Sequence, residues 1–250
     1  MKKAEPESTL GGIRDWFNSP LGRRIVHTEG VILDELLAEL FGYHLLQVSI
    51  SDQTFYNESP VGHRFKMGAS TRHPVEVVGA VNELPFGNDS IDVVILQHLL
   101  DFYESPHPIL REAARVVIPS GYLVIIGFNP WSLWGIPRLV PFLRKKTPWN
   151  RAVIFPARLM DWLTLLDFKI DRAIYGYYNL PIQVSRGLRL PDFSQGLSRK
   201  INWPFGAVYV IVARKQVGSL TPIRPRWRRE SLNGISAIQT ANNVRQRSEH

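Results

Sequence analysis

Short apolar runs alternate with helical patterns along most of this 250-residue chain, and this alternation limits the folds that it can adopt. The runs have the length of strands, and they cover residues 44–50, 74–81, 91–96, 122–128, 169–178 and 207–213. Amphipathic helical spacing lies between several of them, over residues 29–41, after Ser105 and over residues 156–168. Near-continuous apolar strands are typical of parallel sheets that are covered on both faces. We therefore predict an α/β fold with a doubly wound, mostly parallel sheet and helices on both faces.

The composition is typical of a globular protein, and it excludes every site that depends on cysteine. Hydrophobic residues make up 44% and charged residues 21%, which is close to the average for soluble domains. The absence of cysteine excludes a disulfide framework, a thiolate zinc site and a cysteine nucleophile, and we predict no metal site. No apolar secretory run follows Met-Lys-Lys, and no apolar stretch reaches the roughly 20 residues of a membrane span. We therefore expect a cytoplasmic protein without a transmembrane segment.

Composition also divides the chain into three parts. Residues 1–24 read as a polar N-terminal extension, residues 25–217 as the domain, and residues 218–250 as a basic, disordered tail. The formal net charge is +8, and from Lys215 onward there are seven basic residues and two acidic ones. Most of the excess charge therefore belongs to the tail. Its arginines and Trp227 suit contact with nucleic acid or with an anionic membrane surface, and a solubilising or partner-docking tail is the alternative.

Three motifs in the second half of the predicted sheet resemble one family. The first is Leu-Pro-Phe at 84–86 followed by Asn-Asp-Ser-Ile-Asp-Val-Val at 88–94. The second is Leu-Arg-Glu-Ala-Ala-Arg-Val-Val at 110–117, and the third is Pro-Ser-Gly-Tyr-Leu-Val at 119–124. In this order and spacing they resemble the type 11 branch of the class I S-adenosylmethionine-dependent methyltransferases, in bacterial members. The resemblance runs from about residue 36 to about residue 215, and it implies a Rossmann-like fold with S-adenosylmethionine as the cofactor.

The motifs also have a reading from physical chemistry alone. Glu112 and Arg115 lie three residues apart on a predicted helix, where opposite charges attract each other. Gly121 permits a positive φ between this helix and the strand that follows. Both readings leave a purely structural role open for these residues.

The cofactor motif of the family is altered in this chain. The family has an acidic residue and then Gly-x-Gly-x-Gly after the first strand, where residues 47–53 here read Gln-Val-Ser-Ile-Ser-Asp-Gln. The resemblance implies that the cofactor contacts Ser49, Ser51, Asn82, Glu83, Leu84 and Gln97. Ala80 stands where the family has an aspartate that reads the adenine. The segment from the first strand to Leu84 is also short, so either the second strand and its helix are trimmed or the loop is rebuilt.

Polar residues at the carboxyl ends of the predicted strands are the candidates for catalysis, because open α/β sheets bind ligands there. His98 directly follows the apolar run 91–96, and Asp101 lies three residues further on. We predict His98 as a general base with Asp101 beside it, and the alternative is a packing histidine. Residues 131–146 combine tryptophans with basic residues, and they suit a lid, an amphipathic surface element or simple packing over the sheet.

Three functions remain open from the sequence. The first is an S-adenosylmethionine-dependent methyltransferase that acts on a small or lipid-like acceptor. The second is a catalytically inactive protein of the same fold that binds a partner through the basic tail and the tryptophan-rich segment. The third is a dinucleotide-dependent oxidoreductase, which the absence of Gly-x-Gly-x-x-Gly after the first strand makes the weakest.

Overall fold

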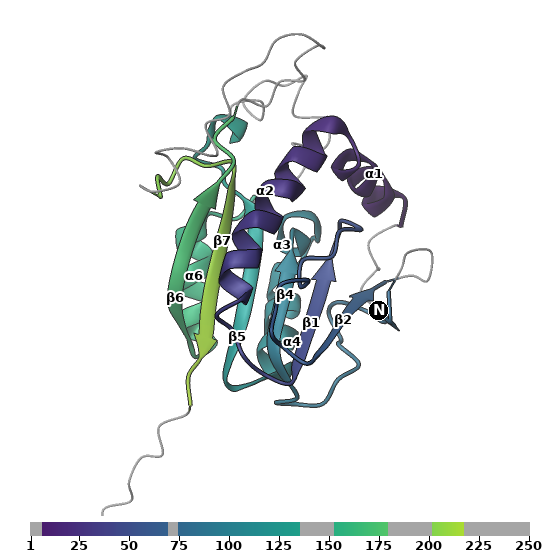
Figure 1. Cartoon of the computed structure of the whole chain (residues 1–250), viewed down its shortest axis with the longest axis vertical. Coiled ribbons are helices and arrows are strands. Elements are labelled where there is room, and N and C mark those ends of the chain that lie inside the picture. Colours follow the sequence, from purple (N-terminus) through teal and green to yellow (C-terminus); the bar gives the residue numbers. More distant parts are fainter. Residues whose placement is uncertain (1–6, 70–74, 136–152, 180–201, 218–250) are drawn as a thin grey trace, which may run out of the picture. The chain divides into compact units, whose positions relative to one another are not determined.

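A computed structural model describes residues 7–69, 75–135, 153–179 and 202–217 of the chain. Within these ranges seven strands form one sheet in the order β3-β2-β1-β4-β5-β7-β6 (Figure 1). The strands are β1 His44–Ser49, β2 His63–Gly68, β3 Val77–Val78, β4 Ile91–Gln97, β5 Val117–Phe128, β6 Phe168–Gly176 and β7 Val208–Lys215. Neighbouring strands from β3 to β5 are parallel, and β7 runs antiparallel to both β5 and β6. The predicted fold class is confirmed.

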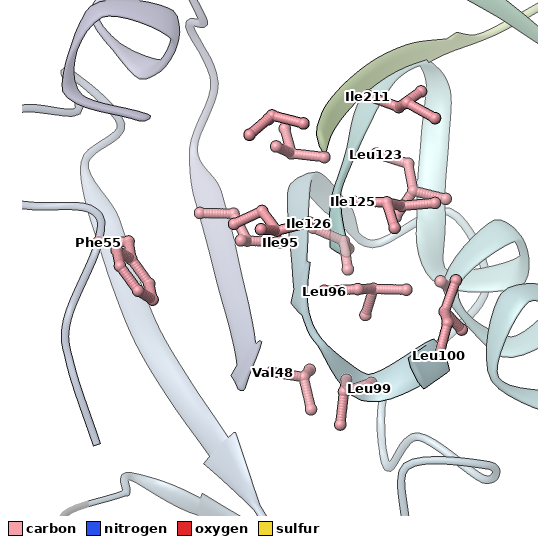
Figure 2. Packing of buried hydrophobic residues seen from close by; sticks show 14 of the residues in the cluster. Val48, Phe55, Ile95, Leu96, Leu99, Leu100, Leu123, Ile125, Ile126 and Ile211 are labelled. Atoms are coloured by element: carbon pink, nitrogen blue, oxygen red, sulfur yellow. The ribbon is translucent and has the colours of Figure 1, made fainter. Parts of the chain in front are cut away.

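Helices cover both faces of the sheet. Figure 1 shows α2 crossing in front of the sheet, with α4 and α6 behind it. The described helices are α1 Glu7–Phe17, α2 Pro20–Leu37, α3 Leu99–Phe102, α4 Pro106–Val116 and α6 Pro156–Leu165. Because both faces are covered, the central strands β4, β5 and β7 are apolar and buried along most of their length. Figure 2 shows Ile95, Ile125 and Ile211 from these strands packed in this core.

Residues 7–17 and those from 20 onward are helical, whereas the sequence reads as a polar extension up to residue 24. Helix α1 buries Ile13 and Phe17, and α2 begins at Pro20, nine residues before the predicted start. The hydroxyl of Ser19 accepts a hydrogen bond from the main-chain N–H of Gly22 at 3.2 Å, which caps α2. The apolar residues of α1 at 10, 13, 16 and 17 recur at helical spacing, but Gly11 and Gly12 lie among them, and glycine lowers the helix propensity of this stretch.

Strand β2 lies in a stretch where the sequence pattern predicts no element. Arg64 and Lys66 interrupt the apolar residues of β2, although Phe65, Lys66 and Met67 are all buried. Parallel strands need a connection of about a dozen residues or more, and residues 50–62 supply it without a helix. The second strand of the family is therefore present, and the connection that leads to it is rebuilt as an irregular loop.

Two strand boundaries differ from the prediction. Strand β3 is limited to Val77 and Val78, within the predicted run 74–81. Strand β5 begins at Val117, directly after α4, instead of at Tyr122. The positive φ expected at Gly121 belongs to Ser120, with φ of 68°. Gly121 serves another purpose, because a Cβ there would lie 2.8 Å from the carbonyl oxygen of Asp92 on the neighbouring strand.

The first two family motifs are joined by a hydrogen-bonded ion pair. Arg115 Nη2 lies 2.7 Å from Glu112 Oε2, as the spacing predicts. Glu112 also accepts a bond from the N–H of Leu84, and Arg115 donates to the carbonyl oxygens of Leu84 and Phe86. The pair therefore fixes the turn before β4 onto α4. The predictions for the tail, residues 218–250, and for most of segment 131–146 lie outside the described residues.

Candidate functional site

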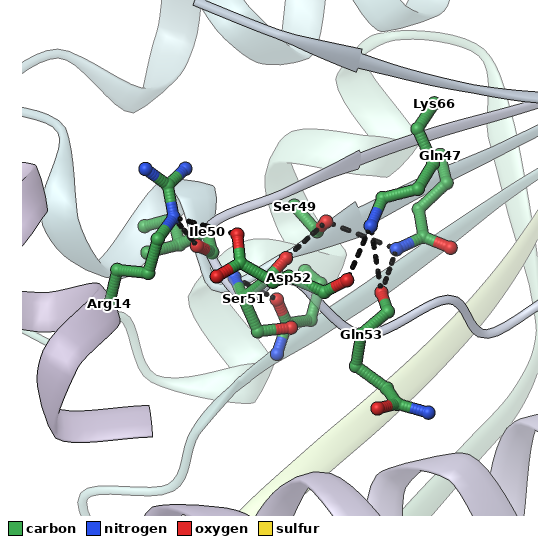
Figure 3. Close-up of polar contacts among 9 residues, drawn as sticks. Arg14, Gln47, Ser49, Ile50, Ser51, Asp52, Gln53 and Lys66 are labelled. Carbon is green, nitrogen blue, oxygen red and sulfur yellow. Dashed lines mark hydrogen bonds and ion pairs between the residues drawn. The ribbon is translucent and has the colours of Figure 1, made fainter. Parts of the chain in front are cut away.

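The loop that follows β1 occupies the place of the family's glycine motif, and side chains hold each of its carbonyl groups (Figure 3). We call residues 50–53 the β1 loop. Its four carbonyl oxygens accept hydrogen bonds from Arg14 Nε at Ile50 (3.0 Å), Ser49 Oγ at Ser51 (3.0 Å), Lys66 Nζ at Asp52 (2.8 Å) and Gln47 Nε2 at Gln53 (2.7 Å). No helix follows to fix the loop, so these side chains determine its conformation.

The N–H side of the β1 loop is held as well. Gln97 Oε1, at the end of β4, accepts a hydrogen bond from the N–H of Ser51 at 3.1 Å. Gln47 Oε1 accepts one from the N–H of Phe55 at 2.9 Å. The hydroxyl of Ser51 is buried and has no hydrogen-bond partner among the residues that the structure describes. The side chain of Gln53 is exposed, so it does not fill the space beside the loop.

Two cations lie on opposite sides of the β1 loop in Figure 3. Arg14 comes from α1, and its Nε lies 3.2 Å from a carboxylate oxygen of Asp52. Lys66 comes from β2 and is 5% exposed. Burial lowers the pKa of the Lys66 ammonium below its usual range, the carboxylates of Asp52 and Glu76 oppose this shift, and Arg14 adds to it. The charge of Lys66 is therefore in a poorly solvated place.

A second polar group lies at the end of β4, and we call Glu29, His98 and Asp101 the His98 cluster. His98 Nε2 lies 2.7 Å from Glu29 Oε1, and His98 Nδ1 lies 2.9 Å from Asp101 Oδ2. All three side chains are buried, with His98 and Glu29 fully enclosed. Gln97 Nε2 also donates to Glu29 Oε2 at 2.9 Å, so the amide of Gln97 links the His98 cluster to the β1 loop.

The protonation of His98 follows from its partners. Burial alone lowers the pKa of His98, but the charge of Glu29 and the hydrogen bonds that His98 donates to Asp101 and Glu29 outweigh it and raise the pKa from 6.5 to about 9. His98 is therefore a cation at neutral pH, held between two carboxylates. Asp101 Oδ2 also accepts the N–H of Phe128 at 2.9 Å, which ties the cluster to β5.

Aromatic rings enclose the His98 cluster. The ring centroid of His98 is 4.2 Å from that of Phe128 and 5.1 Å from that of Phe17. Trp16 of α1 contacts the ring of Phe128 edge-on, and Trp134 stacks on it. Helix α1 therefore covers the ends of β4 and β5. Tyr209 is buried nearby, and burial together with the charge of Asp101 raises the pKa of its hydroxyl well above the usual value. The cluster is closed to solvent in this conformation.

The structure brings together five of the eight residues predicted for the site. Ser49, Ser51, Gln97, His98 and Asp101 belong to one connected set of hydrogen bonds at the carboxyl ends of β1 and β4. Asn82 and Glu83 lie in an exposed turn after β3, and the N–H of Leu84 is bound to Glu112. Within the described ranges, none of these three is hydrogen-bonded to the connected set. The roles assigned to the eight residues stay predictions.

Sequence reasoning missed Arg14, Glu29 and Lys66. Glu29 stands on the apolar stripe of α2 with Ile25, Ile32 and Leu33, and an acid on such a stripe signals a buried partner. Lys66 gives the same signal between Phe65 and Met67, but only once β2 is recognised. Arg14 gives no signal, because it lies in a stretch without an assigned helix.

A cavity of about 450 Å³ opens between α2 and the end of β6. Its apolar wall contains Val31, Ile32 and Ile174, and its polar groups come from His27, Glu35, Asn202 and the tyrosines at 175, 177 and 178. Ile32 also belongs to the buried stripe of α2 that carries Glu29, whereas Val31 and Glu35 lie on the exposed side of the helix. In the described part of the chain, no helix is both long and apolar enough to cross a membrane.

Comparison with known proteins gives relatives of the whole chain and of its fold. A family model described as a methyltransferase domain matches residues 30–125. The Escherichia coli protein YafS, which is described as uncharacterised, is 34% identical over 222 residues, covering 88% of each chain. A Thermotoga maritima structure described as a possible histamine N-methyltransferase superposes with a TM-score of 0.61 at 20% identity, covering 81% of this chain and 93% of that one. An Archaeoglobus fulgidus S-adenosylmethionine-dependent methyltransferase gives a TM-score of 0.55 at 17% identity, covering 75% and 93%.

Proposed function

The chain belongs to the class I S-adenosylmethionine-dependent methyltransferase family, and from this premise we propose that it transfers a methyl group from S-adenosylmethionine to a small or lipid-like acceptor. The observation that carries the proposal is the meeting of the β1 loop with Gln97 and the His98 cluster at one edge of the sheet. Ligands of doubly wound sheets lie beyond the carboxyl ends of the strands, at this edge.

The residues at this edge fit the implied cofactor in their chemistry. Ser49 and Ser51 are small, and the buried hydroxyl of Ser51 is a free donor beside the loop. Lys66 and Arg14 supply positive charge for a carboxylate, and Gln97 fixes the main chain at Ser51. S-adenosylmethionine supplies an activated methyl group on a sulfonium centre, and the protein has to position it and exclude water. We assign the positioning to the β1 loop and to Gln97.

The proposed base, His98, is enclosed in this conformation. Both of its ring nitrogens are bonded to carboxylates, and Phe17 and Phe128 cover its ring. In this conformation His98 holds a proton within the cluster and does not face an acceptor. Its role as a base, with Asp101 beside it, stays a prediction that requires α1 to move away.

The acceptor side of the proposal rests on the cavity between α2 and β6. Its volume of about 450 Å³ lies in the range of small-molecule sites, which run from about 300 to 1,000 Å³. Apolar side chains on one wall and tyrosines on the other suit a molecule with a ring or a short acyl chain. This supports a small acceptor over a macromolecular one.

Isothermal titration calorimetry with S-adenosylmethionine tests the proposal directly. We expect saturable heat at micromolar to millimolar cofactor, and the same titration with adenosine controls for binding of the nucleoside alone. An absence of heat at millimolar cofactor would overturn the methyltransferase proposal.

One observation favours a second function. All four carbonyl groups of the β1 loop are bonded within the protein, as expected of a relative that kept the scaffold and lost the cofactor. Such a protein would act through its basic tail on an anionic partner. Deleting residues 218–250 should then abolish binding to phosphatidylglycerol vesicles or to an RNA oligonucleotide, and undiminished binding of both would refute this alternative.

A further inference from the structure

Lys66 is a buried cation that no carboxylate neutralises by direct contact. Its side chain lies inside a strand that is covered on both faces, and it is 5% exposed. Among the residues that the structure describes, the ammonium contacts only the carbonyl oxygens of Asp52 at 2.8 Å and Gln53 at 3.2 Å. An ion removed from water without an opposite charge carries a desolvation cost, and buried charges are ordinarily paired for this reason. A lysine kept in such a place calls for an anion.

The geometry gives the ammonium a donor to spare. A lysine ammonium has three N–H donors, and the bonds to the carbonyl oxygens of Asp52 and Gln53 use two of them. The nearby acids are engaged elsewhere, because Glu76 accepts the main-chain N–H of Lys66 at 2.8 Å and Asp52 pairs with Arg14 at 3.2 Å. Figure 3 shows the Lys66 ammonium directed at the β1 loop from the side opposite Arg14. A ligand that lies along the loop would therefore meet positive charge on both sides.

We propose that Lys66, assisted by Arg14, binds the carboxylate of the methionine part of S-adenosylmethionine. The inference rests on the proposed function and adds the residues that recognise one end of the cofactor. S-adenosylmethionine carries a single carboxylate and no phosphate, so the carboxylate is the one anionic group that it can offer. In this proposal the side chains of Lys66 and Arg14 bind the methionine end of the cofactor, which the family's glycine-rich main chain would otherwise approach.

A matched pair of ligands isolates this contact. Decarboxylated S-adenosylmethionine retains the adenosine, the sulfonium and the amine, and it lacks only the carboxylate. Calorimetric affinities for both ligands are measured with the full chain, with Lys66→Met and with Lys169→Met, an exposed lysine on β6 that serves as the control. Wild type and Lys169→Met should bind S-adenosylmethionine at least about tenfold more tightly than the decarboxylated form, as expected for a charged hydrogen bond.

The Lys66→Met variant should lose this preference while its affinity for the decarboxylated form changes little. Thermal unfolding of each variant shows that the comparison is made on folded protein, and Lys66→Arg should restore part of the preference because it restores the charge. If wild type binds both ligands equally, or if Lys66→Met weakens both by the same factor, the assignment of Lys66 is overturned and the proposed function stands. If wild type binds neither ligand, both proposals fall.

Discussion

Two buried cations lie at the same edge of the sheet, His98 in its cluster and Lys66 beside the β1 loop, and they differ in their partners. In the His98 cluster a buried cation lies between two buried carboxylates, and aromatic rings of α1 and β5 close it off. Beside the β1 loop the buried cation of Lys66 has, in the described part of the chain, only main-chain carbonyl groups as hydrogen-bond partners, and the loop is partly exposed. The comparison teaches that burial alone does not mark a structural charge. We expect the paired group to stabilise the fold, and we have proposed that the other cation, Lys66, binds a ligand.

Removing one member of the His98 cluster should have the largest effect. Glu29→Met leaves His98 without its nearer carboxylate and leaves Gln97 without an acceptor, so the free energy of unfolding should fall by about 3–5 kcal/mol. Urea unfolding measures the change. Glu35→Met, on the exposed side of the same helix, should cost less than about 1 kcal/mol. A loss below 1 kcal/mol for both variants would show that the cluster does not hold α2 in place.

The second-largest effect should be a pH dependence of the free energy of unfolding that arises from His98. The folded protein raises the pKa of His98 from 6.5 to about 9, so folding favours the protonated ring. This contribution is complete below pH 6.5 and disappears as the pH rises through 9, a loss of about 3 kcal/mol from this group. The difference in unfolding free energy between wild type and His98→Gln should shrink over that range. A difference that grows with pH would contradict the assignment.

Breaking the link between the two groups should cost less. Gln97→Leu leaves the N–H of Ser51 and one oxygen of Glu29 without partners, which should lower the free energy of unfolding by about 2 kcal/mol. Amide hydrogen exchange at Ser51 should become faster in this variant. Gln53→Leu, an exposed glutamine in the same loop, should stay within about 0.5 kcal/mol of wild type. Equal exchange rates at Ser51 in both variants would mean that the groups are independent.

The smallest effect should come from Ser51. Its hydroxyl is buried without a partner, so Ser51→Ala should raise the free energy of unfolding by about 0.5 kcal/mol while it weakens cofactor binding severalfold. Ser49→Ala should instead destabilise the protein by about 1 kcal/mol, because the Ser49 hydroxyl accepts from Gln47 and donates to the carbonyl of Ser51. Calorimetry measures the cofactor affinity of the two variants, and urea unfolding measures their free energy of unfolding. Destabilisation by Ser51→Ala would show that its hydroxyl has a structural role.

The fold was largely accessible from the sequence, because buried parallel strands leave unbroken apolar runs. The runs at 91–96 and 207–213 correspond closely to β4 and β7. Strand β2 gives no such run, since Arg64 and Lys66 interrupt its apolar residues. Helix α1 was missed for another reason: only the assembled sheet shows which surface its few apolar side chains cover.

The candidate site was accessible only in part. The rule that ligands lie at the carboxyl ends of parallel strands led to Ser51, Gln97 and His98. It could not supply Glu29, which is 69 residues away from His98 along the chain, or Lys66, which reaches the β1 loop from the neighbouring strand. Sequence spacing reports contacts within one element, whereas these contacts cross between elements.

Because α1 packs over β5, this contact cannot form during synthesis until β5 has been made. Phe17 stacks on Phe128 with ring planes 10° apart, so its final neighbour emerges from the ribosome much later than Phe17 itself. At a translation rate of roughly 5–20 residues per second, the interval is on the order of 5–20 s. During this time the apolar side of α1 has no sheet to cover. Packing of α1 against β5 is therefore completed only after β5 has been synthesised.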